Sequence, residues 1–325
     1  MTMICKTQNQ RHSHLKRDYY YSAARNAMKD FIAKVAVEKS SFSPTTVLLP
    51  SYIGVSPKEG SGIFDPIVEL SDKGLIDFSF YRMTNDLRID VTDVARIVRD
   101  LGERTFIFLQ VNYFGFVDPS ERIVYKIVKN AGGIVLEDNA HSFFTYHYRQ
   151  NHYCDACFFS LHKQFPFEQG GMLRITNDAL TNLSYSGSKD PSPEADPWIY
   201  DFRSISQTCR NNFLAVQELM DKNLDLWTPI RTLSSYDYTV PQTFPIALLS
   251  SDRFKVYLDM NELGFGVTSL YHTLIEPLRD DPRFEESRRL AACVLNLPVH
   301  QDVDASLYPD LIDSLKRSCR TNGIA

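Results

Sequence analysis

Two residues near the middle of the chain have the types and the spacing of a covalent cofactor site. Asp138 follows the apolar run Ile134-Val135-Leu136, and Lys163 comes later, ahead of the pair Gly170-Gly171. A lysine amine can form a Schiff base with an aldehyde, and an aspartate can keep a pyridine nitrogen protonated so that the ring accepts electrons. The pair therefore predicts a pyridoxal phosphate (PLP) site with Lys163 and Asp138 as its catalytic residues.

Both residues also have simpler explanations. Aspartate is a favoured N-cap where a strand turns into a helix, and lysine is seldom buried without a partner, so Lys163 could lie on a surface loop. Yet the residues around Lys163, 158–161 and 165–166, are mainly aromatic or small. Such surroundings lower the pKa of a lysine and make its amine a better nucleophile. Glu137 is expected to point away from the site, because neighbouring strand residues face opposite sides.

Three further segments could contribute to such a site. The hydroxyl of Ser160 could bind a phosphate, or it could simply end a strand. Residues 21–26 (YSAARN) open a helix with small residues, and the free N–H groups and dipole of a helix start favour an anion, although an ordinary capped helix looks the same. The glycine-rich stretch 59–62 lacks the spacing of a nucleotide-binding loop, and we interpret it as a turn that could approach the cofactor.

Zinc is the competing hypothesis for one cluster. Cys154 and Cys157 form a CxxC with His147 and His152 nearby, which are zinc-binding residue types. No second CxxC is present, and Cys157 leads directly into an apolar strand. We therefore expect no metal site.

The elements that must hold these residues alternate between strands and helices. Apolar runs predict strands at 46–50, 75–81, 105–112 and 133–137, and helical spacing predicts helices at 26–37, 91–101 and 119–130. This order indicates an α/β fold with a mainly parallel sheet covered on both faces. Ligands bind at the carboxyl ends of such strands, where Asp138 and the loop 112–115 fall.

The second half of the chain has a different pattern. It predicts a strand at 172–175, a surface loop at 186–197, a helix at about 205–225, a strand at 243–249, a helix at 252–264, another strand and a last helix at 303–317. We expect a flexible basic tail (1–18), a large cofactor-binding domain (19–226) and a smaller α+β domain (227–325), since 325 residues exceed the usual size of one core.

Composition narrows the functional classes. The 35 basic and 40 acidic residues give a net charge of −5, which argues against nucleic-acid binding. No uninterrupted apolar stretch is long enough for a transmembrane helix, and the basic N-terminus is not followed by the apolar core of a secretory signal. The six cysteines are irregularly spaced, as is typical of free thiols in a cytoplasmic protein.

Six short motifs resemble those of the DegT/StrS-type sugar aminotransferases, which are fold-type-I PLP enzymes, and they occur in the order of that family. LEDNAH (136–141) is similar to the family's I-E-D-x-A-H/Q, and SLHKQFPFEQGG (160–171) is similar to its S-x-R-K-x-x-P-x-x-D-G-G. The others are VLLPSYIG (47–54), VNYFGF (111–116, like H-x-F/Y-G), TFPI (243–246) and LNLPVHQDV (295–303). The resemblance implies a three-layer PLP-transferase fold.

The resemblance also assigns roles to single residues. It implies that Lys163 carries the cofactor, that Asp138 pairs with the pyridine nitrogen and that His141 lies near the phenolic oxygen. Ser160 would bind the phosphate together with the backbone groups of Ala24 and Arg25. An asparagine from the neighbouring subunit completes the phosphate site in the family; Asn212 is the candidate here, and this implies a homodimer with shared active sites.

The implied activity is transfer of an amino group, with L-glutamate as donor, to a nucleotide-linked keto-sugar in amino-sugar or polysaccharide synthesis. Three departures concern substrate recognition: SAARNAM (22–28) lacks the usual glycine, His162 and Glu168-Gln169 replace other residue types, and the chain is shorter than most members. A PLP-dependent dehydratase of the same fold stays open as an alternative, because those relatives carry histidine in place of the lysine and His162 is adjacent to Lys163. A non-catalytic binding or regulatory relative also stays open.

Overall fold

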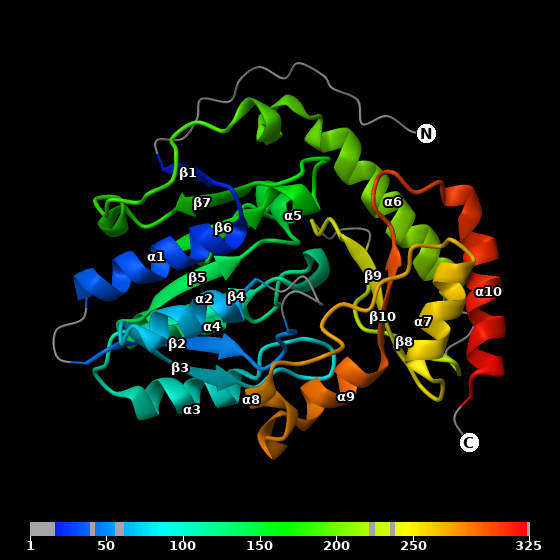
Figure 1. Cartoon of the computed structure of the whole chain (residues 1–325), viewed down its shortest axis with the longest axis horizontal. Helices are drawn as coiled ribbons and strands as arrows, with labels where there is room; N and C mark the ends of the chain where they lie inside the picture. Colours follow the sequence, from blue (N-terminus) through cyan, green and yellow to red (C-terminus); the bar gives the residue numbers. More distant parts are fainter. Residues whose placement is uncertain (1–16, 40–42, 56–61, 221–224, 235–237, 324–325) are drawn as a thin grey trace.

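A seven-stranded, mainly parallel sheet forms the larger part of the molecule (Figure 1). The computed structural model describes residues 17–39, 43–55, 62–220, 225–234 and 238–323. The strand order is β1-β7-β6-β5-β4-β2-β3; β2 to β6 are parallel, and β7 is antiparallel to both of its neighbours. The strands are β1 (Asp18–Tyr21), β2 (Thr45–Pro50), β3 (Ile76–Tyr81), β4 (Phe106–Val111), β5 (Ile134–Asp138), β6 (Ala156–Ser160) and β7 (Gly171–Ile175).

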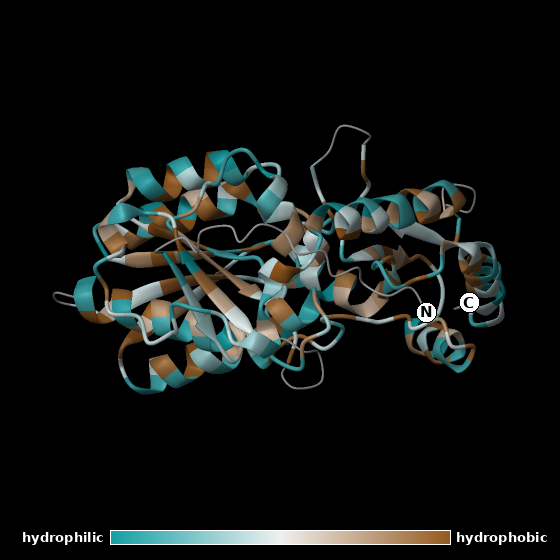
Figure 2. Cartoon of the chain, turned by 90° about the horizontal axis from the view of Figure 1, so that it is seen from above, coloured by the Kyte–Doolittle hydropathy of each residue, from teal (hydrophilic) through white to brown (hydrophobic). Residues whose placement is uncertain are grey.

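Helices cover both faces of this sheet, as the view from above shows (Figure 2). α1 packs against α2, and α3 packs against α4, so each pair covers part of a face. Strands buried on both sides explain the continuous apolar run of β4, in which Phe106, Ile107, Phe108 and Leu109 have no exposed surface. The helices are α1 (Ala24–Lys39), α2 (Phe64–Asp72), α3 (Val91–Leu101), α4 (Glu121–Asn130) and α5 (Phe143–Tyr148).

α3 illustrates how local sequence sets these helices. Its buried residues Val94, Ile97 and Val98 recur at helical spacing and face the core. The side chain of Asp90 caps the helix by accepting the backbone N–H of Asp93 at 3.0 Å. Gly102 ends it with a φ of 62°, a conformation that glycine adopts without strain. The predicted and observed bounds of this helix agree.

A second, three-stranded antiparallel sheet has the order β10-β9-β8. α6 packs against β9 and α10, so it lies with this sheet rather than with the large one (Figure 1). The strands are β8 (Trp227–Pro229), β9 (Thr243–Leu248) and β10 (Val294–Pro298), and the helices are α6 (Phe202–Met220), α7 (Arg253–Glu262), α8 (Glu276–Arg279), α9 (Glu285–Cys293) and α10 (Tyr308–Thr321). The division of the chain at residue 226 stays a prediction.

Single-turn 3-10 helices occupy many of the connections. They are η1 (Tyr113–Gly115), η2 (Leu161–Lys163), η3 (Asp178–Leu180), η4 (Pro193–Ala195), η5 (Pro197–Ile199), η6 (Pro282–Phe284) and η7 (Ala305–Leu307). Two of them carry site segments, because η1 follows β4 and η2 follows β6.

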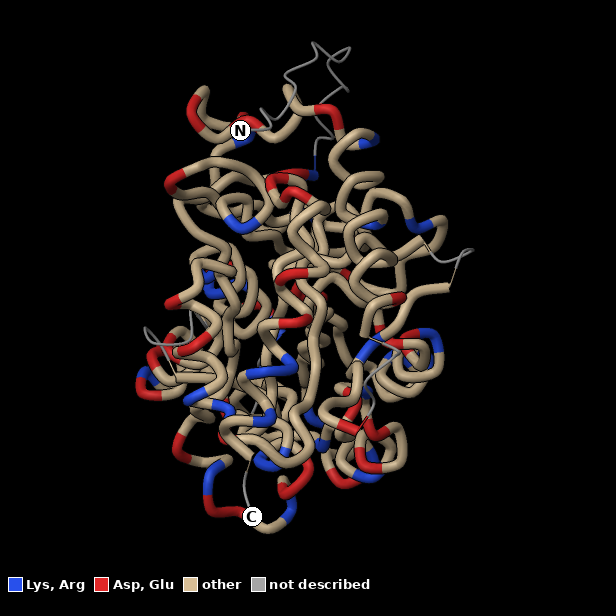
Figure 3. Tube along the Cα trace, turned by 90° about the vertical axis from the view of Figure 1, so that its right-hand side faces the viewer, with Lys and Arg blue, Asp and Glu red and all other residues tan. Residues whose placement is uncertain are grey.

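The surface carries both signs of charge. Basic and acidic positions are interspersed along the trace in the side view (Figure 3), in keeping with the composition. Among the helices of the described residues, none combines the length and the apolarity that crossing a bilayer requires. The tail predicted at 1–18 falls almost wholly outside the described residues, as do three of the four residues of the predicted turn at 59–62.

Candidate functional site

The ends of three parallel strands and the start of α1 enclose one pocket. Val111 and Asn112 come from the end of β4, Asp138 from the end of β5 and Ser160 from the end of β6, as the parallel sheet predicts. The other wall residues are Ala23, Ala24, Arg25, Gly62, Ile63, Ala140, His141, Phe158, His162, Lys163 and Tyr271. Of the residues predicted from the sequence, this pocket brings together Lys163, Asp138, His141, Ser160, Ala24 and Arg25.

Lys163 and His141 are in direct contact. Nζ of Lys163 lies 3.0 Å from Nε2 of His141, and Nδ1 of His141 accepts the backbone N–H of Phe114 at 3.3 Å. A backbone N–H can only donate, so in the neutral ring the proton is on Nε2 and points at the lysine. The lysine must then accept it through a lone pair, which only an unprotonated amine has.

The electrostatics of the pair agree with this assignment. Burial lowers the pKa of Lys163, and the positive charge of Arg25 acts in the same direction, while Asp138 opposes them. Burial also lowers the pKa of His141 well below its usual value, and Lys163 adds to the effect. A lowered pKa leaves more of the amine unprotonated at a given pH, and the unprotonated amine is the form that attacks a carbonyl carbon.

Asp138 presents a buried carboxylate to the same pocket. Its Oδ1 accepts the backbone N–H of Ala140 at 2.8 Å, and only 4% of the residue is exposed. Burial raises its pKa to about 6, although the Ala140 N–H and Lys163 pull it down. A cation placed against this carboxylate would replace the lost hydration and return the pKa toward its ordinary value.

Glu137 faces the other way, as the strand alternation predicts. It accepts hydrogen bonds from Asn112 Nδ2 at 2.7 Å, Asn139 Nδ2 at 3.0 Å and Arg149 Nη1 at 2.7 Å. Burial alone would raise its pKa, but Arg149 and the two amides hold the pKa below its usual value. Glu137 is therefore ionised and bonded to side chains of the surrounding fold, whereas Asp138 faces into the pocket.

The opposite end of the pocket suits an anion. Ala23, Ala24 and Arg25 start α1, whose first turn has no acidic residue, and buried Ser160 completes this end. Gly171 makes this arrangement possible, since a Cβ there would overlap the backbone of Ala23 and Ala24. Gly171 therefore lets the start of α1 approach the start of β7, a role that the sequence did not reveal.

Asn212 lies elsewhere. Its Nδ2 donates to the backbone oxygens of His300 at 3.1 Å and Val303 at 3.4 Å, and only 4% of the residue is exposed. It belongs to α6 and does not line the pocket of its own chain. The role suggested for Asn212 concerns a neighbouring subunit and stays a prediction.

The structure gives no metal site at the CxxC. Among the described residues, no three histidine, cysteine, aspartate or glutamate side chains cluster as metal ligands. His147 Nδ1 is bonded to the backbone oxygen of Phe143 at 2.7 Å, and Cys154 lies 3.9 Å from Thr176 Oγ1. His162 is also engaged nearby, with Nδ1 3.3 Å from Ser160 Oγ.

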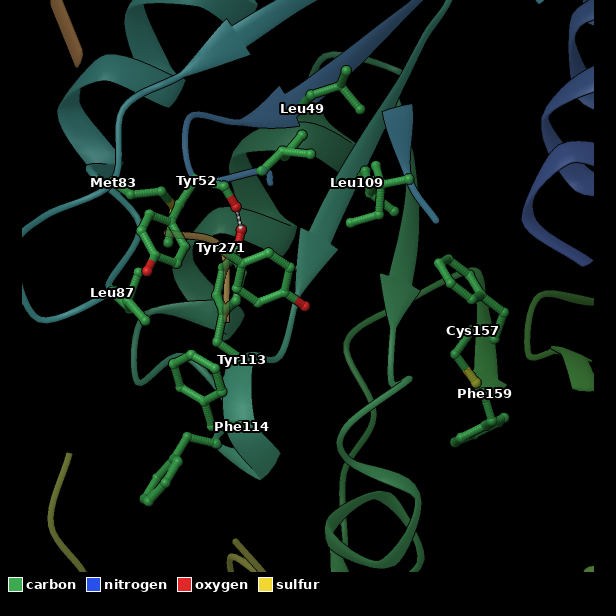
Figure 4. Packing of buried hydrophobic residues seen from close by; sticks show 14 of the residues in the cluster. Leu49, Tyr52, Met83, Leu87, Leu109, Tyr113, Phe114, Cys157, Phe159 and Tyr271 are labelled. Atoms are coloured by element: carbon green, nitrogen blue, oxygen red, sulfur yellow. Dashed lines mark hydrogen bonds between the residues drawn. The ribbon is translucent and has the colours of Figure 1, made fainter. Parts of the chain in front are cut away.

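Sequence reasoning missed Tyr271 and the role of Asn112. Tyr271 reaches the pocket from the segment before α8 and packs near Tyr52, Tyr113 and Phe114 (Figure 4). Tyr271 and Phe114 have φ angles of 62° and 58°, which non-glycine residues seldom adopt and which often mark functional sites. No local sequence pattern predicts this position for Tyr271, because only the tertiary fold brings it into the same pocket as Lys163.

Comparisons with known proteins match the fold. No protein-family model matches the sequence, and no curated protein does. A DegT DnrJ EryC1 StrS aminotransferase from Brucella abortus superposes with a TM-score of 0.67 and 13% identity over 92% of this chain and 85% of that one. PseC of Helicobacter pylori, an aminotransferase involved in the biosynthesis of pseudoaminic acid, gives 0.70 and 13% over 94% and 87%.

A third solved structure, from Streptococcus pneumoniae and described as a sugar aminotransferase in its PLP form, gives a TM-score of 0.67 and 11% identity over 94% of this chain and 87% of that one. The chain thus has the fold of these aminotransferases, and this confirms the predicted fold class. At such identities the likeness concerns the fold, so the chemistry has to be argued from the residues of the pocket.

Proposed function

We propose that this protein is a PLP-dependent aminotransferase that converts a nucleotide-linked keto-sugar into an amino sugar, with L-glutamate as the amino donor. The observation that carries the proposal is the buried amine of Lys163, 3.0 Å from Nε2 of His141, in one pocket with the buried carboxylate of Asp138. The likeness in fold to sugar aminotransferases supports it independently.

The residues of the pocket fit PLP. Lys163 would bind the aldehyde carbon, Asp138 would face the ring nitrogen, and Ser160 with the start of α1 at Ala24 and Arg25 would hold the phosphate. A protonated ring nitrogen is the cation that the buried Asp138 lacks.

PLP, when bound, supplies an electron sink for the carbanion that forms at Cα of the amino donor. The residues of the chain supply the proton transfers and the orientation. Nζ of Lys163 would act as the base that takes the proton from Cα of the donor and as the acid that returns it. The Nε2–H of His141 would donate to the lone pair of Lys163 and so orient the amine. Asp138 would place a negative charge beside the ring nitrogen and so keep that nitrogen protonated.

The finer parts of the proposal rest on the resemblance. The nucleotide-linked sugar, the glutamate donor, a homodimer and a cytoplasmic setting follow from the motifs at 136–141 and 160–171 and from the composition. The homodimer also rests on the proposed role of Asn212, which would complete the phosphate site of the neighbouring subunit.

The dehydratase alternative is less favoured by the geometry. It requires a histidine in the position of the lysine, whereas Lys163 itself lies in the pocket next to His141. His162 also lines the pocket, but its ring is directed to Ser160.

The visible absorption spectrum of the purified protein with PLP tests the proposal. A band in the visible that bleaches when L-glutamate is added is the expected result, and borohydride should fix the cofactor to the peptide that contains Lys163. A band unaffected by glutamate would point to another donor or to the dehydratase. No band at all would contradict the proposed function, and it would leave a non-catalytic binding role.

A further inference from the structure

A second cavity lies at the junction between the two sheets. It has a volume of about 620 Å³. The loop after β4 (116–121), α5 and the segment after β8 (229–234) contribute most of its wall. It shares no wall residue with the pocket of Lys163. What it could bind follows from the charged side chains around it.

Arg231 is a buried cation in this wall, and its acidic neighbours Asp118 and Asp86 lie beyond ion-pair distance and only partly offset its burial. It is 9% exposed, its Nη2 donates to the backbone oxygen of Leu87 at 2.8 Å, and its Cζ lies 6.0 Å from the ring centre of Phe116. Within the described part of the chain it makes no ion pair. A buried charge is costly unless it is paired, and burial accordingly lowers the pKa of this guanidinium.

The other N–H groups of Arg231 are available to the cavity. A guanidinium has five N–H donors in a flat fork, of which one bond to Leu87 is accounted for. None of its nitrogens is among the sealed polar atoms that lack a partner in the described residues, so they face the open space. A planar fork of this kind matches the oxygens of a carboxylate or a phosphate.

The other charged groups of the wall leave room for an anion. Arg88 is paired with Asp86 at 2.7 Å and Arg149 with Glu137 at 2.7 Å, so among the described residues of this wall Arg231 is the arginine that makes no ion pair. Both oxygens of Asp118 are engaged: Oδ2 accepts the backbone N–H of Ile89 at 2.7 Å, and Oδ1 accepts the N–H of Ser120 at 2.7 Å. Burial raises the pKa of Glu121 to about 7, against the pull of Arg149, so its charge is easily removed.

We propose that this second cavity is a binding site for an oxyanion, a phosphate or a carboxylate group, with Arg231 as its counter-ion. The ligand could be free phosphate, the diphosphate of a nucleotide or a dicarboxylate, and these share the chemistry that Arg231 recognises. The site is separate from the anion end of the Lys163 pocket, which Ser160 and the start of α1 form.

Thermal unfolding of the PLP-saturated protein tests this site, because the cofactor then fills the first pocket. Sodium phosphate, uridine diphosphate and succinate are each compared with sodium chloride at constant ionic strength. At least one of the three should raise the Tm of the wild-type protein, and the variant Arg231→Met should lose that gain, with binding weakened at least about tenfold. The anion with the largest gain identifies the source.

In chloride alone, Arg231→Met should be at least as stable as the wild type, because an apolar chain replaces a buried charge that its neighbours only partly offset. The matched control is Arg174→Met. Arg174 is equally buried but is held by two bonds of 2.7 Å to Asp18, so this control should lose stability in every buffer and keep the gain from the anion.

Two results would overturn the proposal: no gain from any of the three anions, or an equal gain in the wild type and in Arg231→Met. A loss of stability by Arg231→Met in chloride with an unchanged gain from the anion would give Arg231 a purely structural role. The spectrum with PLP reports separately on the first pocket, so a failure there is not confused with a failure here.

Discussion

Nζ of Lys163 lies 3.0 Å from Nε2 of His141, and the other ring nitrogen of that histidine accepts the backbone N–H of Phe114. One imidazole thus links the reactive amine to a backbone position that has a positive φ. The conformation after β4 therefore determines the tautomer of His141, and the tautomer determines which partner Lys163 meets.

Replacing His141 separates these two bonds. His141→Leu should cost about 1–3 kcal/mol of unfolding free energy, because the buried Phe114 N–H loses its acceptor. His141→Asn keeps an acceptor near the position of Nδ1 and should cost less, while it still removes the N–H that faces Lys163. Urea unfolding of the two variants measures the difference. Equal losses would show that the Phe114 N–H does not depend on His141.

The pH dependence of stability reports on Asp138. Its folded-state pKa of about 6 exceeds the ordinary aspartate value of 3.8, so the folded state holds this proton to higher pH than the unfolded state does. The protonated carboxyl therefore contributes about 3 kcal/mol to the unfolding free energy. This contribution is complete below about pH 4 and is lost as the pH rises through 6. In the cofactor-free protein, Asp138→Asn should lack this loss. Parallel stability curves for the two proteins between pH 4 and 7 would contradict the raised pKa.

Gly171→Ala tests the contact between the start of α1 and the start of β7. The added Cβ overlaps the backbone of Ala23 and Ala24, so the start of α1 must move. We expect the unfolding free energy to fall by at least about 2 kcal/mol because the site is overpacked. We also expect weaker PLP binding, because the anion-binding end of the pocket is displaced. Gly264→Ala is the control, because Gly264 has a φ of 83° but nothing within 4 Å, and it should cost only about 1 kcal/mol. A similar effect of both variants on PLP affinity would argue against the role of Gly171.

Arg149→Met tests the charge network under the pocket. Its Nη1 lies 2.7 Å from Glu137 and 3.2 Å from Glu121, so the variant leaves two buried carboxylates without their cation. The expected loss is about 3–5 kcal/mol at neutral pH, and it should shrink as the pH falls and the carboxylates become protonated. The control is Arg96→Met, which removes an arginine that is 48% exposed. Losing its ion pairs should lower the unfolding free energy by less than about 1 kcal/mol. Chemical denaturation at pH 5 and pH 7 distinguishes the two.

The parallel sheet and the two central site residues could be predicted from the sequence because they depend on local patterns. Apolar strand runs place Asp138 at the end of β5, and the rule that ligands bind at strand ends brings it near the loop after β6. Residue type alone singled out Ser160 and the helix start at 21–26, whereas His141 and the specific roles of Ala24 and Arg25 came from the resemblance; the structure places all four residues in the same pocket as Lys163. Their roles toward the cofactor stay predictions.

Other parts were missed for physical reasons. α9 has mostly polar residues and only three buried ones, so its helical pattern is faint. The last helix begins at Tyr308 rather than at 303, since Pro309 occupies a position near the helix start that proline favours. Tyr271 and Arg231 reach their sites through contacts between distant segments, and no local periodicity encodes such contacts. Asn212 was assigned by its distance along the chain from Lys163, and its role toward a neighbouring subunit stays a prediction.

Among the described residues β1 comes first in chain order, and its partner β7 is synthesised much later. Asp18 and Arg174, which pair across these strands, are separated by 156 positions. Until β1 docks, β7 is an unprotected sheet edge that other chains could extend, and its apolar residues are prone to aggregation. Because the start of α1 follows directly after β1, closing that edge also sets the anion end of the pocket in place. Deleting the residues of β1 should therefore yield a protein that self-associates and that binds a phosphate group more weakly.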